Sequence, residues 1–211
     1  LLLICFQCIC TDLSAQNHLF FNHPVYKNHF TATERTGLAR IIAWVDSLIL
    51  INNPHEEMNK AYHYYLDSIY RARKNGDRDA LAFDTEEKYE FLFNLDTCLF
   101  DELWIKATTA RWVKTRDTIL HHPENFFTIH FNPHGAYVNL LSDLGDSINY
   151  FQHLHHNIHI MSGIGASVFS GFLHFHERLD FSNLHYRLWA AILLLSTGNA
   201  EEEVELYLSR P

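Results

Sequence analysis

Residues 153 to 159 read HLHHNIH, and these four histidines are the side chains of this chain best suited to bind a metal ion. If the segment is helical, a turn of about 100° per residue places His155, His156 and His159 on one polar side. His155 and His159 are separated by one helical turn, and two imidazoles at that spacing can bind the same zinc ion. The pair is therefore a candidate metal site.

A zinc site needs at least a third protein ligand. His174, His176 and Glu177 follow on the next expected helix and supply that ligand if the two helices run antiparallel. The chain has no HExxH or CxxC pattern, and a sequence with 16 histidines produces some pairs at helical spacing without any metal. Two interpretations follow: a zinc-binding protein or zinc-dependent hydrolase that uses His155 and His159, or a solvated histidine face.

The segment from Ile160 to Leu173 reads IMSGIGASVFSGFL and carries no charge. It is too short to cross a membrane, which takes about 20 residues. Its Gly163 and Gly165 follow no strand, so they do not form a dinucleotide fingerprint. We predict a buried central helix that packs closely against a neighbour. A pocket behind it would suit a small-molecule carrier, a third possible function.

Composition limits the class of protein. Of 211 residues, 47% are hydrophobic and 19% are charged, which is typical of a globular chain. With only eight Gly and five Pro, a β-sandwich with many turns is disfavoured. The formal net charge is −9 and the Lys and Arg residues are scattered, so we expect no nucleic-acid partner.

The N-terminal segment has the character of a processing signal. Leu1 to Cys10 is almost wholly apolar and Leu13-Ser14-Ala15 ends in small residues. Residues 1–15 resemble a secretory signal whose basic n-region is missing, which predicts an exported protein, periplasmic or secreted. Residues 16–211 would form the mature domain, without a transmembrane anchor. That domain keeps a single cysteine, Cys98, which we predict to be a buried and inert thiol.

Helix start and stop signals recur along the chain. Thr31 with Glu34, and Asp84 with Glu87, form capping patterns ahead of periodic apolar residues. The pair Asn75-Gly76 is a stop signal. Helices are expected over 31–52, 53–75, 86–121 (as one helix or two), 134–144, 146–160, 162–179, 182–196 and 200–209.

Two turns in the second half are alike. LLSDLGDS ends one expected helix and LLLSTGNA ends another, each with two leucines, three further residues, Gly and then Asp or Asn. This pattern is typical of an αα-hairpin, with Gly145 or Gly198 in a left-handed cap and Asp146 or Asn199 capping the next helix. The segment 122–133, HPENFFTIHFNP, has two prolines and predicts an ordered loop or an isolated strand. It is the expected sub-boundary.

These patterns predict an all-α single domain of about seven helices, arranged as antiparallel αα-hairpins after the signal-like segment. Stacked hairpins present an extended surface, and no catalytic arrangement stands out from the sequence. The favoured function is therefore a non-catalytic protein-interaction or binding module of the cell envelope, with another protein as the partner.

Overall fold

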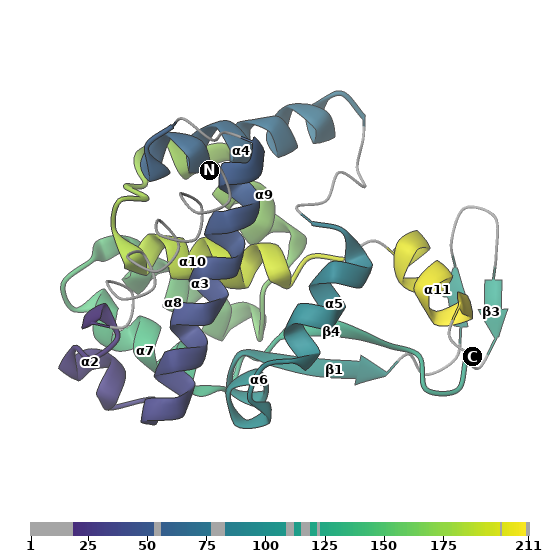
Figure 1. Cartoon of the computed structure of the whole chain (residues 1–211), viewed down its shortest axis with the longest axis horizontal. Coiled ribbons are helices and arrows are strands. Elements are labelled where there is room, and N and C mark those ends of the chain that lie inside the picture. The colour runs from purple at the N-terminus through teal and green to yellow at the C-terminus, as the bar shows by residue number, and fades with distance from the viewer. Residues whose placement is uncertain are drawn as a thin grey trace, which may run out of the picture.

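Figure 1 shows a computed structural model of the chain, which is predominantly helical. It describes residues 19–52, 56–76, 83–108, 112–114, 119–121, 123–198 and 200–209. The helices are α2 (Pro24–Lys27), α3 (Ala32–Asn52), α4 (Met58–Lys74), α5 (Thr85–Phe93), α6 (Thr97–Leu103), α7 (Ala136–Gly145), α8 (Asn149–Met161), α9 (Ala166–Phe175), the short 3-10 helix η1 (His176–Arg178), α10 (Leu184–Leu195) and α11 (Ala200–Ser209). The mainly helical architecture expected from the sequence is therefore confirmed.

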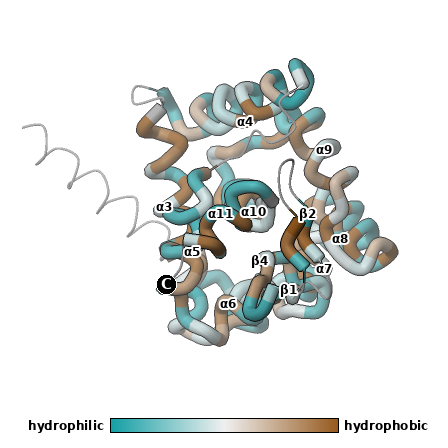
Figure 2. The backbone as a smooth tube through the Cα atoms, turned by 90° about the vertical axis from the view of Figure 1, so that its right-hand side faces the viewer, coloured by the Kyte–Doolittle hydropathy of each residue, from teal (hydrophilic) through white to brown (hydrophobic). Residues whose placement is uncertain are grey.

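The centre of the core is α10. Ten of its twelve residues are buried, and Trp189 is among the largest fully buried side chains of the part described. In Figure 2 this helix runs through the middle of the molecule, with α3, α4, α8 and α9 around it. A helix that is apolar on all sides needs such a position, because each of its faces must be removed from water.

The sequence predicted a buried central helix over Ile160 to Leu173; the structure has a partly buried helix, α9, in the second part of this stretch, and the central position belongs to α10. Met161 is the last residue of α8, and α9 begins only at Ala166. Between them Ser162 has φ of 52° and Gly163 has φ of 147°, both in the left-handed region that ends a helix. The uncharged stretch therefore contains the end of α8, a turn over residues 162–165 and most of α9.

Four strands correct the all-α prediction. β1 (Trp104–Thr108) pairs antiparallel with β4 (Phe127–Phe131), and β2 (Trp112–Lys114) pairs antiparallel with β3 (Ile119–His121). The segment 86–121 is thus two helices followed by strands, and the segment 122–133 contains a paired strand instead of an isolated one. The β-prone residues of β1 and β4 are stabilised by partners distant in sequence, which helical periodicity does not reveal.

The expected start signals do form. Thr31 accepts a hydrogen bond from the Glu34 N–H at 3.3 Å, while the Glu34 carboxylate accepts from the Thr31 N–H at 2.7 Å. The Asp84 side chain accepts from the Glu87 N–H at 3.0 Å. The predicted stop at Asn75-Gly76 also forms. Lys74 is the last residue of α4, and Gly76 has φ of 99°.

The turn between α7 and α8 differs from the predicted one. Gly145 is the last residue of α7 and its φ is not positive, and the N-cap of α8 is Ile148 instead of Asp146. A Cβ at Gly145 would lie 2.9 Å from the Cα of Gln152. Glycine is required here because it lets α7 and α8 approach closely. The matching turn at Gly198 has no left-handed glycine either, and Asn199 lies outside the described residues.

A buried ion pair joins α3 to the central helix. The Asp46 carboxylate is 1% exposed, accepts a hydrogen bond from Arg187 at 2.7 Å and another from the Tyr62 hydroxyl at 2.8 Å. Burial raises the pKa of Asp46 to about 6, although the Arg187 charge and both hydrogen bonds act to lower it. Three elements, α3, α4 and α10, therefore meet at one polar contact inside the core.

Two further sequence predictions concern the surface and the N-terminus. Cys98 is exposed, so its predicted burial is wrong: α6 turns Leu99 and Leu103 inward and Cys98 outward.

No helix within the described ranges is long and apolar enough to cross a membrane. The signal-like residues 1–15 lie outside the described residues, so export stays a prediction.

Candidate ligand-binding site

The predicted metal ligands on α8 lie on its outer side. His155 is half-buried, His156 and His159 are exposed, and the apolar residues Phe151, Leu154 and Ile158 are buried on the other side of the helix. This separation is the one that the helical period predicts. The rings of His155 and His159 are stacked with their centroids 6.4 Å apart.

The other predicted ligands face α4 instead of the α8 pair. His174 Nδ1 lies 3.3 Å from the Tyr70 hydroxyl, and His176 Nδ1 lies 3.1 Å from His63 Nδ1. Glu177 is exposed. In the part of the chain that the structure describes, no group of three or more His, Cys, Asp or Glu side chains is arranged to hold a metal ion. The structure does not bring the five candidate ligands together, and the zinc site stays a prediction.

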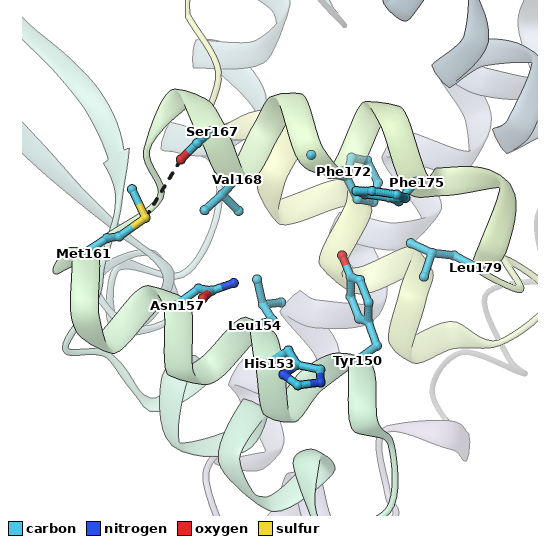
Figure 3. A pocket seen from close by; sticks show the side chains of 11 residues that line it. Tyr150, His153, Leu154, Asn157, Met161, Ser167, Val168, Phe172, Phe175 and Leu179 are labelled. Carbon is cyan, nitrogen blue, oxygen red and sulfur yellow. Dashed lines mark hydrogen bonds between the residues drawn. The ribbon is translucent and has the colours of Figure 1, made fainter.

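A cavity of about 410 Å³ opens between α8 and α9. Figure 3 shows its walls, with α8 on one side and α9 on the other. The lining residues are Tyr150, His153, Leu154, Asn157, Met161, Ser167, Val168, Gly171, Phe172, Phe175 and Leu179. Most of these are aliphatic or aromatic, so the cavity suits an apolar occupant.

Gly171 leaves open space in the wall of the cavity. It lies within α9, and a Cβ built on it would meet no heavy atom within 4 Å. Glycine inside a helix costs roughly 0.5–1 kcal/mol relative to alanine. Since no close contact and no positive φ requires glycine at this position, its effect in the structure is to widen the cavity.

Tyr150 supplies an oriented polar group. Its oxygen accepts a hydrogen bond from the Trp189 indole N–H at 3.0 Å, which fixes the phenol against the central helix. Figure 3 shows the hydroxyl directed across the cavity toward Phe172 and Phe175. Burial raises the pKa of Tyr150 to about 12, so the phenol keeps its proton at neutral pH. It can therefore donate a hydrogen bond to an acceptor on a ligand.

The remaining polar groups lie near the edge of the cavity. His153 and Asn157 are exposed, and they are one helical turn apart on α8. At the end of the cavity nearest the turn, Ser167 Oγ lies 3.9 Å from the Met161 sulfur. A flexible methionine at an opening can adapt to the shape of an occupant.

A second cavity, of about 650 Å³, begins on the other side of Met161. Its lining includes Arg73, His130, Thr197 and the turn that contains Gly163. The Arg73 guanidinium lies over the Phe169 ring at 4.7 Å. This cavity is more polar than the first, and Met161 is the residue that the two share.

Sequence reasoning identified part of this site. A pocket behind the glycine-rich segment was one of its three functions, and Gly171 and Phe172 belong to both that segment and the cavity wall. Tyr150, His153 and Asn157 were not identified. Their spacing on α8 was a usable signal, since Tyr150, His153, Leu154 and Asn157 recur at three or four residues, but periodicity alone does not distinguish a cavity wall from a packed face.

Comparison with known proteins gives no relative of this chain. No protein-family profile, no curated protein and no solved structure matches it. The function of this chain is therefore inferred from the cavity between α8 and α9 and the side chains that line it.

Proposed function

We propose that this chain is a binding protein that takes a compact, mainly apolar ligand into the cavity between α8 and α9. The observation that carries the proposal is the open space beside Gly171 within an apolar cavity of about 410 Å³. Ligand pockets in proteins are typically about 300–1,000 Å³ and have a few oriented polar groups among apolar walls. The Tyr150 hydroxyl, which accepts a hydrogen bond from the Trp189 indole N–H, is such an oriented polar group.

The walls define the ligand class. Phe172, Phe175 and Leu179 offer aromatic and aliphatic surface, which favours a flat ring system or a short branched hydrocarbon. Tyr150 favours one hydrogen-bond acceptor on that ligand, such as a carbonyl or ether oxygen. No charged side chain lines this cavity within the described residues, so an uncharged ligand is favoured over an ion.

The proposal is tested with an uncharged fluorescent probe, N-phenyl-1-naphthylamine, titrated against the protein at about pH 7. We expect saturable binding that Gly171→Leu weakens at least about tenfold, because the new side chain enters the cavity. Ser170→Leu is the matched control, since Ser170 is exposed on the same helix and does not line the cavity. That variant should bind the probe as the wild type does.

Equal weakening by the two leucine variants would mean that the probe binds elsewhere or responds to a general change in α9. An absence of saturable binding by the wild-type chain would contradict the proposed function. Circular dichroism of each variant confirms that α9 and its neighbours are still folded.

A protein partner, which the sequence favoured, is the second candidate. Trp112 and Ile119 are 56% and 51% exposed on the outer side of the β2–β3 hairpin, and exposed tryptophan is typical of recognition surfaces. Figure 1 places this hairpin beside α11, at the opposite end of the molecule from α7 and α8. Serine at both positions would therefore reduce partner binding without changing the α8–α9 cavity.

Two expectations from the sequence are retained as proposals. Export is supported by the apolar residues Leu1 to Cys10 and the small residues that follow them. Zinc binding is supported by the helical spacing of His155 and His159, with His174, His176 or Glu177 as the additional ligand.

A further inference from the structure

The second cavity, of about 650 Å³, lies where α4, β1, β4, α9 and α10 meet, and the proposed function does not use it. The turn between α8 and α9 and the residues that follow α10 complete its walls. Its volume is within the range of about 300–1,000 Å³ that is typical of ligand pockets. The cavity is therefore large enough for a small organic molecule.

The titratable groups that line this cavity are basic. Arg73 and His130 line it, and within the described residues no Asp or Glu does so, although the chain has 25 acidic residues. The Glu203 carboxylate acts on His130 from α11 without lining the cavity, and the charge of Lys88 compensates it. Because arginine keeps its positive charge at every physiological pH, the cavity favours an anion over a cation.

The wall of the cavity orients Arg73. This residue is half-buried near the end of α4, and its guanidinium lies over the Phe169 ring at 4.7 Å. Phe169 is buried on α9 and lines the same cavity. Stacking uses the flat face of a guanidinium, whereas its N–H groups lie in the plane and match the two oxygens of a carboxylate. Arg73 is therefore preorganised to bind a carboxylate.

Two other polar groups of the wall already have partners. The Thr197 hydroxyl donates to the Leu194 carbonyl oxygen at 2.7 Å, so its oxygen can accept a hydrogen bond from a ligand but has no hydrogen left to donate. His130 Nε2 lies 2.7 Å from the Thr128 hydroxyl. Arg73 is consequently the side chain best suited to hold the anionic group of a ligand.

Most of the remaining wall is apolar. Aliphatic and aromatic side chains cover it, among them Ile105, Phe131, Pro133, Ile164, Phe169 and Leu193. Such a surface favours a ring or a hydrocarbon body. The ligand class that fits the whole cavity therefore combines an apolar body with one carboxylate.

We propose that this cavity is a second binding site, which takes a small aromatic carboxylate whose anionic group binds Arg73. The inference goes beyond the proposed function, because the α8–α9 cavity favours an uncharged ligand and shares only Met161 with the second cavity. The two cavities thus select their ligands by charge.

The test is a calorimetric titration of the protein with cinnamate and with its uncharged amide, cinnamamide, at about pH 7, where the acid is ionised. For the wild-type chain we expect saturable binding of cinnamate and at least about tenfold weaker binding of cinnamamide. Arg73→Gln should weaken cinnamate binding at least about tenfold and change cinnamamide binding less than about twofold. If that variant does not fold, Arg73→Met removes the same charge and keeps an apolar stem against Phe169.

Arg71→Gln is the matched control, because Arg71 is exposed on the same helix and does not line the cavity. It should bind cinnamate as the wild type does. The inference would be overturned by an absence of saturable cinnamate binding, by equal affinity for the acid and the amide, or by equal weakening in the two glutamine variants.

Failure of this site and failure of the proposed function are distinguishable. Arg73→Gln should bind N-phenyl-1-naphthylamine as the wild type does, since Arg73 does not line the α8–α9 cavity. Cinnamate binding that Gly171→Leu weakens as strongly as Arg73→Gln does would place the acid in the α8–α9 cavity. That result would overturn the second site and leave the first one intact.

Discussion

Asp46 shows how a single residue can hold three elements together. Its carboxylate contacts Arg187 and Tyr62 and is almost wholly buried. We expect Asp46→Ala to lower the free energy of unfolding by about 3–5 kcal/mol, because it leaves the Arg187 charge buried without its carboxylate. Urea unfolding at neutral pH measures the loss. The double variant Asp46→Leu with Arg187→Met should cost less than the two single changes added together, and strict additivity would contradict this account.

At the same residue scale, the sequence located part of the candidate site and missed its geometry. The side of α8 that carries His155 and His159 follows from the helical period alone. The direction of His174 and His176 depends on how α9 leaves α8. That direction is set by the left-handed residues Ser162 and Gly163, whose conformation one sequence does not specify.

At the scale of an element, α9 contains a residue of low helix propensity, Gly171, beside an open cavity. We expect Gly171→Ala to raise the free energy of unfolding by about 0.5–1 kcal/mol, since alanine favours the helix and its Cβ meets no neighbouring atom. Thermal unfolding measures the gain. Ser170→Ala on the exposed side should give a smaller gain, because serine is already a better helix former than glycine. A loss of stability in Gly171→Ala would show that the space is not open.

Helices were easier to predict than strands for a physical reason. The capping pairs of α3 and α5 are hydrogen bonds between residues three positions apart, so a short window of sequence contains all the information. The pairing of β1 with β4 joins Trp104 to Phe131 across an intervening hairpin, and no local pattern contains it. For the same reason α10 was predicted as a helix but not as the centre of the core.

At the scale of the whole molecule, histidines whose pKa is lowered by burial make the folded chain less stable in acid. Burial lowers the pKa of His63 and His176, and it lowers the pKa of His185 to about 4, with the charge of His23 acting in the same direction. In the unfolded chain these groups take up protons near pH 6.5. The stability that they contribute is therefore complete above about pH 6.5 and is lost as the pH falls toward 4. Asp46 has the opposite effect on stability. Its pKa is higher in the folded chain than in the unfolded chain, so the proton that it binds on acidification favours the folded chain.

His185→Asn isolates this effect. The His185 ring stacks on Tyr26 and its Nδ1 lies 2.6 Å from the Tyr26 hydroxyl, a contact that an Asn amide can replace without a titrating group. We expect the variant to be less stable at about pH 7 through lost packing, yet to lose roughly 1–2 kcal/mol less than the wild type between about pH 7 and pH 4.5. Urea unfolding at both pH values measures the difference, with His156→Asn as the control for an exposed histidine. Equal losses in His185→Asn and the wild type would show that His185 titrates normally in the folded chain, and acid stability would then depend on the pair at α4 and η1.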